Sequence, residues 1–162
     1  MEYPLIDANE AENTRDKILL TAVKMFSERG YAAVSMRDIA HEVQLKPASL
    51  YHHFDGKEAL FDDIVETISQ AYMDFYDRTG REVAKVESFA QVLDCLFAEL
   101  KVVYHMFIHY GVSLLAAEQY RSDKARMAFN NIYIGIGIDY SARLFDDAIA
   151  KGWVKPFDTQ AL

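Results

Sequence analysis

Apolar residues recur every three or four positions along most of the chain, which is the spacing of amphipathic α-helices. The first helix is predicted from a stripe formed by Ile18, Leu19, Ala22, Val23 and Phe26. Asn13 or Thr14 is positioned to cap its start, and Gly30 can end it in a left-handed conformation. No segment alternates apolar and polar residues as a half-buried strand would. The pattern therefore predicts an all-α protein.

Two short helices joined by a tight turn are predicted between residues 35 and 57. Ser35 and Asp38 have the spacing of a capping box at the start of the first helix, and Pro47 suits the first turn of the second. The apolar positions that would hold the two helices together are Ile39, Ala40, Val43, Leu45 and Leu50. This arrangement is typical of a helix-turn-helix with its turn at residues 43–46, and the polar outward side chains of its second helix suit the major groove of DNA.

Two more helices are predicted after this unit. Asp55 and Glu58 have the spacing of a second capping box, which would open a long helix that Gly80 is expected to end. Ser88 and Gln91 predict the start of the next helix in the same way. The long helix begins beside the helix-turn-helix and continues into the rest of the protein, so it would link the two parts physically.

The last third of the chain predicts a shorter helix over residues 106–119 and a long one from residue 122 or 123 to Lys151. Gly135 and Gly137 fall inside the long helix, where each costs about 1 kcal/mol relative to alanine. Two such residues in one helix indicate close packing or a bend.

Charge is divided unevenly along the 162 residues, whose net charge is −8. Residues 13–57 hold seven basic and five acidic side chains, a balance of +2, whereas residues 58–162 have a balance of −6 and residues 1–12 one of −4. This asymmetry fits a local phosphate-contacting face on an acidic body that would resist indiscriminate nucleic-acid binding.

The protein is expected to be cytoplasmic and to have no contact with a membrane. Its start is acidic and polar, unlike a signal peptide, and no apolar run is long enough to span a bilayer. The single cysteine, Cys95, excludes an internal disulfide and fits a reducing compartment.

The segment from Thr14 to Val65 resembles the N-terminal DNA-binding domain of TetR-type (TetR/AcrR family) transcriptional regulators. Three blocks carry the resemblance in order: F-x-x-x-G-Y at the end of the first helix, then S-M-R-D-I-A, then L-Y-H-H-F-x-x-K-x-x-L. Residues 1–12 have no apolar period and are expected to form a mobile arm. The resemblance implies a three-helix DNA-binding domain over 13–57 and a helical effector-binding domain over 58–162. Gln44 departs from the pattern, because such turns usually hold a glycine there; a left-handed Gln44 would cost about 1 kcal/mol.

The resemblance also implies roles for single residues in binding double-stranded operator DNA. Ser35, Tyr51 and Lys57 are expected to contact phosphate. The candidates for contacts to base edges or the adjacent backbone are Arg37, Lys46, Ala48, Ser49 and His52. His53 and Phe54 are expected to face inwards as packing residues.

The second half is rich in aromatic residues, most of which a helical bundle would use as core. Their number and their polar neighbours also suggest a pocket for a small hydrophobic or aromatic effector. The pocket would also accept an effector that has one polar end. The residues predicted to bind it are Phe97, Tyr104, His109 and Tyr133. Core packing and ligand binding stay open as alternatives for each of them.

Neither a metal site nor a catalytic site is predicted, and no cofactor is expected. His105 and His109 share one helix face, and Cys95 could add a sulfur ligand. However, the sequence has no second pair of acidic or histidine residues at matching spacing. No glycine-rich phosphate loop, G-x-S-x-G or paired C-x-x-C occurs, so the protein is not expected to be an enzyme. The alternative to a regulator is a helical protein-interaction or metal-sensing module with weak or no DNA binding.

These patterns together predict a ligand-responsive transcriptional regulator, with repression favoured and activation left open. Members of the family typically continue after a G-x-x-x-P-x-D segment, here GWVKPFD, into two long helices that form the dimer interface. The sequence is therefore expected to be a C-terminally truncated form of a homodimer, which alone would be monomeric or weakly paired. A monomer offers one recognition helix where two, about 34 Å apart, are needed.

Overall fold

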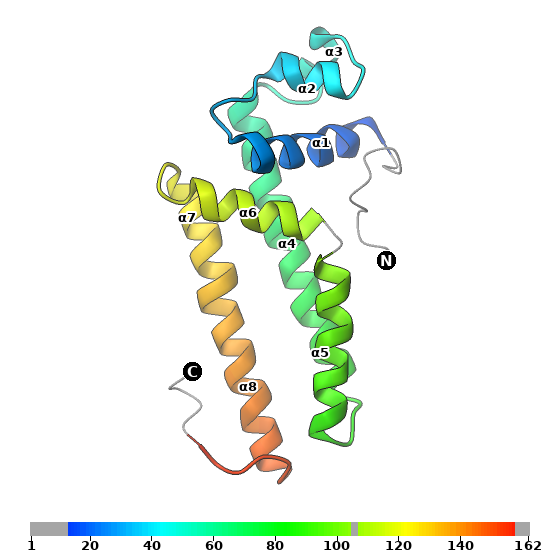
Figure 1. Cartoon of the computed structure of the whole chain (residues 1–162), viewed down its shortest axis with the longest axis vertical. Helices are drawn as coiled ribbons and strands as arrows, with labels where there is room; N and C mark the ends of the chain where they lie inside the picture. The colour runs from blue at the N-terminus through cyan, green and yellow to red at the C-terminus, as the bar shows by residue number, and fades with distance from the viewer. Residues whose placement is uncertain (1–12, 105–106, 158–162) are drawn as a thin grey trace.

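The computed structural model describes residues 13–104 and 107–157, without the side chains of residues 99–104, 107, 108 and 133. Every element within these residues is helical, which confirms the predicted all-α class (Figure 1). The elements are α1 (Thr14–Arg29), α2 (Met36–Glu42), α3 (Pro47–Tyr51), α4 (Lys57–Val83), α5 (Phe89–Tyr104), α6 (Phe107–Glu118), α7 (Asp123–Phe129), the π-helix η1 (Asn130–Ile136) and α8 (Gly137–Ala150).

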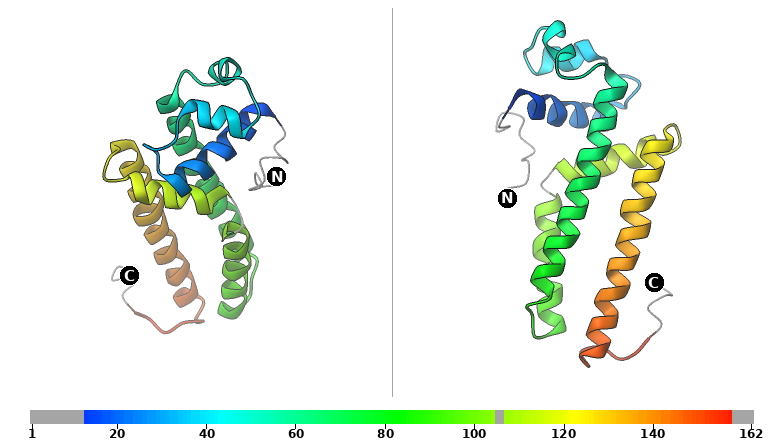
Figure 2. Two further views of the ribbon diagram at one scale, coloured as in Figure 1. Left: turned by 45° about the horizontal axis from the view of Figure 1, so that its top comes forward. Right: turned by 180° about the vertical axis from the view of Figure 1, so that it is seen from behind.

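Helix α4 connects the two ends of the molecule. Its first turns lie among α1, α2 and α3, and its second half runs beside α5 and α8 (Figures 1 and 2). The three-helix end is held by fully buried side chains from α1, α2, α3 and α4. The largest of these are Ile18, Phe26, Ile39, Leu50 and Leu60. The chain therefore has a packed N-terminal body that contains the helix-turn-helix, followed by a second helical body, as predicted.

Both ends of α1 follow their local sequence. The Asn13 side chain accepts a hydrogen bond from the backbone N–H of Asp16 at 2.9 Å, so Asn13 is the N-cap. Gly30 has a φ of +86°, and its N–H donates to the carbonyl of Phe26 at 2.9 Å. These contacts confirm the predicted cap and the predicted end of the helix.

The predicted limits of α4 are wrong at both ends. Its N-cap is Gly56, which has no side-chain hydrogen bond, so Asp55 and Glu58 do not form a capping box. The helix also continues through Gly80 to Val83. A Cβ built at Gly80 would lie 3.8 Å from a ring carbon of Tyr140 in α8, so Gly80 faces a packed neighbour, and this tertiary contact outweighs its weak helix propensity.

The predicted last helix consists of three consecutive segments, α7, η1 and α8. Ser122 caps its start by accepting from the N–H of Ala125 at 3.2 Å. The π-helical segment ends next to Gly137, where a Cβ would lie 3.1 Å from the hydroxyl oxygen of Tyr76 in α4. Gly137 therefore marks a close approach to α4 beside a change of helix type, which is the packing that the sequence indicated, whereas a Cβ at Gly135 would meet only Asn130 and Asn131 of its own segment.

The turn between α2 and α3 keeps its left-handed residue although glycine is missing. Gln44 has a φ of +59°, and the turn closes with a 2.8 Å hydrogen bond from Leu45 N–H to the carbonyl of Ala40. The backbone geometry of the helix-turn-helix is therefore maintained against the steric preference of a residue with a Cβ.

We expect Gln44→Gly to raise the free energy of unfolding by about 0.5–1 kcal/mol, because glycine adopts this φ without a Cβ clash. Denaturant unfolding of the variant and the native chain measures the difference. Gln44→Ala serves as the matched control and should show no such gain, since alanine retains the clash. A Gln44→Gly variant that is less stable than the native chain would contradict the prediction.

Helix α6 joins the two bodies. It packs on α1 and crosses α4, with Leu114 and Leu115 fully buried in the shared core. At the crossing, a Cβ built on Gly111 would lie 2.6 Å from Cγ1 of Ile68 in α4. The α4–α6 contact is thus too close for any side chain at Gly111.

Candidate DNA-binding face and ligand cavity

Ser35 and Asp38 form the predicted capping box at the start of α2. The Ser35 hydroxyl oxygen accepts from the Asp38 N–H at 3.2 Å, and the Asp38 carboxylate accepts from the Ser35 N–H at 2.8 Å and from its hydroxyl at 2.6 Å. These hydrogen bonds from Ser35 lower the pKa of Asp38 below its ordinary value of 3.8, because they stabilise the charged carboxylate. The cap fixes the position from which Ser35 would meet DNA.

We expect Ser35→Ala to lower the free energy of unfolding by about 1 kcal/mol, the usual effect of losing an N-cap. The native chain should also lose stability as pH falls below about 4, because a carboxyl with a depressed folded pKa stabilises the fold only while ionised. In Ser35→Ala this acid-dependent loss should be smaller. Denaturant unfolding at pH 7 and pH 3 measures both effects.

Ser122→Ala is the control for this prediction, because Ser122 caps α7 without a reciprocal carboxylate on its own backbone N–H. It should lose stability equally at both pH values. An unchanged difference between pH 7 and pH 3 in Ser35→Ala would contradict the role assigned to Asp38.

Four of the predicted DNA-binding residues lie around one open groove of about 520 Å³. Ser35 and Arg37 border it from α2, Tyr51 from the end of α3, and Lys57 from the start of α4. The Tyr51 side chain is 52% exposed, which is unusual for a tyrosine with a purely structural role. The groove combines hydroxyl, guanidinium and ammonium groups, the donors that contact phosphate in DNA complexes.

The Lys57 side chain is held in place by contacts to Tyr31 and Phe26. Its ammonium donates a hydrogen bond to the carbonyl oxygen of Tyr31 and lies 4.1 Å from the centre of the Tyr31 ring and 5.6 Å from that of Phe26. Partial burial lowers the pKa of Lys57, against the opposing effects of the Glu118 and Asp38 carboxylates. Lys57 therefore stabilises the junction of α1 and α4 besides placing a positive charge at the groove.

The other four predicted residues lie on or beside α3. Lys46, Ala48 and His52 are exposed and Ser49 is half-buried, while Leu50 on the opposite side is fully buried. The expected inward orientation is confirmed for Phe54, which is buried, and wrong for His53, which is exposed. Helix α3 ends at Tyr51, so His53 lies in the following turn and no longer follows helical periodicity.

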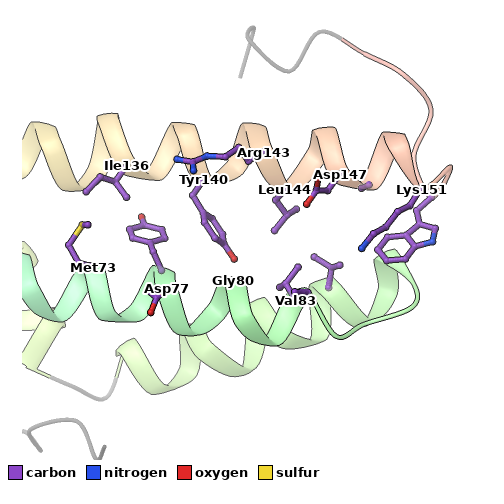
Figure 3. A pocket seen from close by; sticks show the side chains of 15 residues that line it. Met73, Asp77, Gly80, Val83, Ile136, Tyr140, Arg143, Leu144, Asp147 and Lys151 are labelled. Carbon is purple, nitrogen blue, oxygen red and sulfur yellow. The ribbon is translucent and has the colours of Figure 1, made fainter.

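A second hollow lies between α4 and α8 (Figure 3). Its volume is about 370 Å³, within the roughly 300–1,000 Å³ range of small-molecule sites. The apolar and aromatic side chains that line it include Met73, Tyr76, Val92, Tyr140, Leu144 and Trp153. Burial raises the pKa of Tyr76, because it disfavours the charged phenolate.

Of the four predicted ligand-binding residues, Phe97 and His109 are not among those that line this cavity. Phe97 is 61% exposed on α5 and His109 is exposed on α6. The side chains of Tyr104 and Tyr133 lie outside the described part of the structure. These four positions stay a prediction. The sequence did not indicate the lining residues because they converge from α4, α5, η1, α8 and the turn after α8. The apolar spacing of Met73, Tyr76 and Val83 on α4 was the one signal for them.

Three charged groups at the cavity edge, Asp77, Arg143 and Lys151, interact with other groups of the protein. Asp77 forms an ion pair with Arg81 one turn further along α4. The Lys151 ammonium lies 4.5 Å from the centre of the Trp153 ring, and Arg143 Nε donates to the carbonyl of Asp139 at 3.3 Å. The site thus offers an aromatic interior with cations at its edge.

Metal binding has little support in the described residues. They contain no group of three or more His, Cys, Asp or Glu side chains placed to hold a metal ion. Cys95 is half-buried on α5, and His105 of the predicted histidine pair lies outside these residues. As for membranes, none of the described helices is both long and apolar enough to cross one.

Comparisons with known proteins agree with this architecture. Residues 18–64 match the model of bacterial regulatory proteins, tetR family. Over 79 residues, 49% of this chain and 43% of the relative, the sequence is 35% identical to the Staphylococcus epidermidis biofilm operon icaADBC HTH-type negative transcriptional regulator IcaR. The chain therefore aligns with less than half the length of this curated relative.

Two solved structures share the fold along almost the whole chain. The ketosteroid transcriptional regulator KstR2 of Mycobacterium tuberculosis has a TM-score of 0.70 and 24% identity, over 94% of this chain and 76% of that one. Salmonella enterica GusR has a TM-score of 0.64 and 27% identity, over 94% of this chain and 78% of that one. The N-terminal part of the chain is thus similar to the tetR family of bacterial regulatory proteins, and almost the whole chain shares the helical fold of these two solved structures.

Proposed function

We propose that this chain is the DNA-binding and effector-sensing part of a transcriptional repressor. The observation that carries the proposal is the gathering of Ser35, Arg37, Tyr51 and Lys57 around one groove beside the exposed side of α3. Residues 13–57 would form the DNA-binding domain and residues 58–162 the effector domain. The relatives are transcriptional regulators, and IcaR is described as a negative one, which supports repression.

The release of DNA would depend on α4. Its first residue, Lys57, borders the DNA-binding groove, and its second half, from Met73 to Ala84, lines the cavity. A small apolar or aromatic effector that binds one arrangement of α4 and α8 more tightly shifts the population towards that arrangement. Because α4 also carries α1–α3, its movement would change where α3 meets the major groove.

Tight operator binding would require a homodimer, because two recognition helices must fit successive major grooves about 34 Å apart. The second half-site adds affinity only when the two protomers are joined, through effective concentration. We therefore propose a palindromic operator, bound weakly by a single protomer.

Selection of bound sequences from a random duplex library tests the proposal. We expect a palindromic preference, and an affinity for the selected duplex that falls steeply as salt rises from 50 to 200 mM, as phosphate contacts require. A scrambled duplex of equal length is the control. Equal affinity for both duplexes, or no binding at low salt, would overturn DNA-dependent regulation.

A helical protein-interaction module is the second candidate. The observation in its favour is an exposed apolar set along α7, η1 and α8, formed by Met127, Ile134 and Ile138. The duplex experiment separates the two readings, because an interaction module would bind no duplex in a salt-dependent, sequence-selective way.

A further inference from the structure

The cavity between α4 and α8 is long and narrow. Its lining runs from Met73 on α4 to Ala84, the C-cap of that helix, and from Ile136 at the end of η1 to Lys151, the C-cap of α8. At a rise of 1.5 Å per residue, these stretches are about 16 Å and about 22 Å long. The two helices run side by side in the same direction, so the hollow extends along them (Figure 3). A volume of about 370 Å³ spread over this length suits an extended molecule better than a compact one.

The two ends of the cavity differ in polarity. Met73 and Ile136 lie at one end, where both labelled side chains are apolar (Figure 3). Asp147 and Lys151 line the other end, and Tyr140 lies between the two ends (Figure 3). The Tyr76 ring is 5.2 Å from that of Tyr140, and the Trp153 ring lies against the Lys151 ammonium. An occupant would therefore place its apolar end near Met73 and its polar end near Lys151.

The charges favour an anion at the polar end. Asp77 is already paired with Arg81, and the Trp153 ring already carries the Lys151 ammonium, so the carboxylate of Asp147 is the feature of the described lining that is left to attract a cation. Arg143, Asp147 and Lys151 follow one another at a spacing of four residues and share one face of α8. Two cations and one carboxylate leave a surplus positive charge there.

We propose that this cavity binds an elongated organic anion, with its apolar body along Tyr76 and Tyr140 and its carboxylate-like head between Arg143 and Lys151. Both cations are exposed, so the head group keeps contact with water and contributes selectivity more than affinity. The regulatory consequence rests on the proposed function, whereas the binding itself does not.

Trp153 allows the binding to be measured directly. It is the only tryptophan of the chain and it lines the cavity, so its fluorescence reports occupancy without DNA. Three probes with the same alkyl chain and different heads are dodecanoate, 1-dodecanol and dodecyltrimethylammonium, each used below its aggregation concentration. We expect dodecanoate to bind about fivefold or more tightly than the ammonium probe, with the alcohol between them.

Charge variants test the assignment of the head group. Lys151→Gln and Arg143→Gln should each weaken dodecanoate binding about three- to fivefold and leave 1-dodecanol unchanged. Lys155→Gln is the matched control, because Lys155 is exposed and does not line the cavity. Ile136→Phe should weaken dodecanoate more than hexanoate, since it fills the apolar end that only the longer chain reaches.

The outcomes separate this inference from the proposed function. Tighter binding of the ammonium probe, equal effects of Lys151→Gln and Lys155→Gln, or no binding of any probe to the native chain would overturn the inference, even if the selected duplex is bound. Dodecanoate binding with the expected charge order but without any change in duplex affinity would support the inference and overturn effector release of DNA.

Discussion

Gly111→Ala is expected to destabilise the protein by about 1–3 kcal/mol, although alanine is the better helix former. The new Cβ would lie 2.6 Å from Cγ1 and 2.7 Å from Cδ1 of Ile68. Ile68 is fully buried and its branched side chain is stiff at χ1, so it cannot move aside cheaply. The α4–α6 crossing must open instead, which disturbs the contact between the two bodies. Denaturant unfolding at pH 7 measures the loss.

Gly80→Ala is the matched control, because its Cβ would lie at an ordinary 3.8 Å from the Tyr140 ring. It should raise stability by about 0.5–1 kcal/mol through helix propensity alone. In a double-mutant cycle, Ile68→Ala should remove the cost of Gly111→Ala, since the clashing atoms are gone. Equal signs for the two glycine variants, or additive effects of the Gly111 and Ile68 changes, would contradict the close crossing.

Arg37→Ala and Ser49→Ala are expected to change which operator bases are preferred and to cost about 1–3 kcal/mol of binding, or roughly 5- to 150-fold in affinity. Arg37 is exposed and Ser49 is half-buried, and both lie in the helix-turn-helix that we propose to meet DNA. Tyr51→Phe should instead lower affinity by a similar factor for every sequence, because a phosphate contact positions the protein without reading bases. Panels of single-base operator variants, titrated at three salt concentrations, distinguish these patterns.

The Lys155→Ala variant is the control for charge, since the segment that follows α8, to which Lys155 belongs, lies at the opposite end of the molecule from α3 (Figure 1). Lys57→Ala should lower both duplex affinity and stability, because it also loses the hydrogen bond to the Tyr31 carbonyl. A uniform loss in Arg37→Ala, with a salt slope reduced by about one, would reassign Arg37 to the phosphate backbone. An unchanged affinity for all four variants in the DNA-binding domain would show that DNA meets another face.

Local sequence by itself determined the helical class, the N-terminal domain and most of the points at which its helices begin and end. The Asn13 cap, the end at Gly30 and the Ser35–Asp38 capping box each depend on atoms within four residues, so residue spacing predicts them. These features are short-range, and no distant part of the chain alters them. The left-handed turn at Gln44 is an exception, because the sequence left open whether the turn would keep this geometry without glycine.

Tertiary structure alone decided where α4 ends, where the last helix becomes π-helical and which residues line the cavity. Gly80 stays helical because it lies against Tyr140, and Gly137 meets Tyr76 across the same interface. The lining side chains come from positions more than 50 residues apart, and Phe97, aromatic and at helical spacing, is largely exposed. Helical periodicity shows which face of a helix is apolar but not which helix it meets, because that choice depends on packing between distant segments.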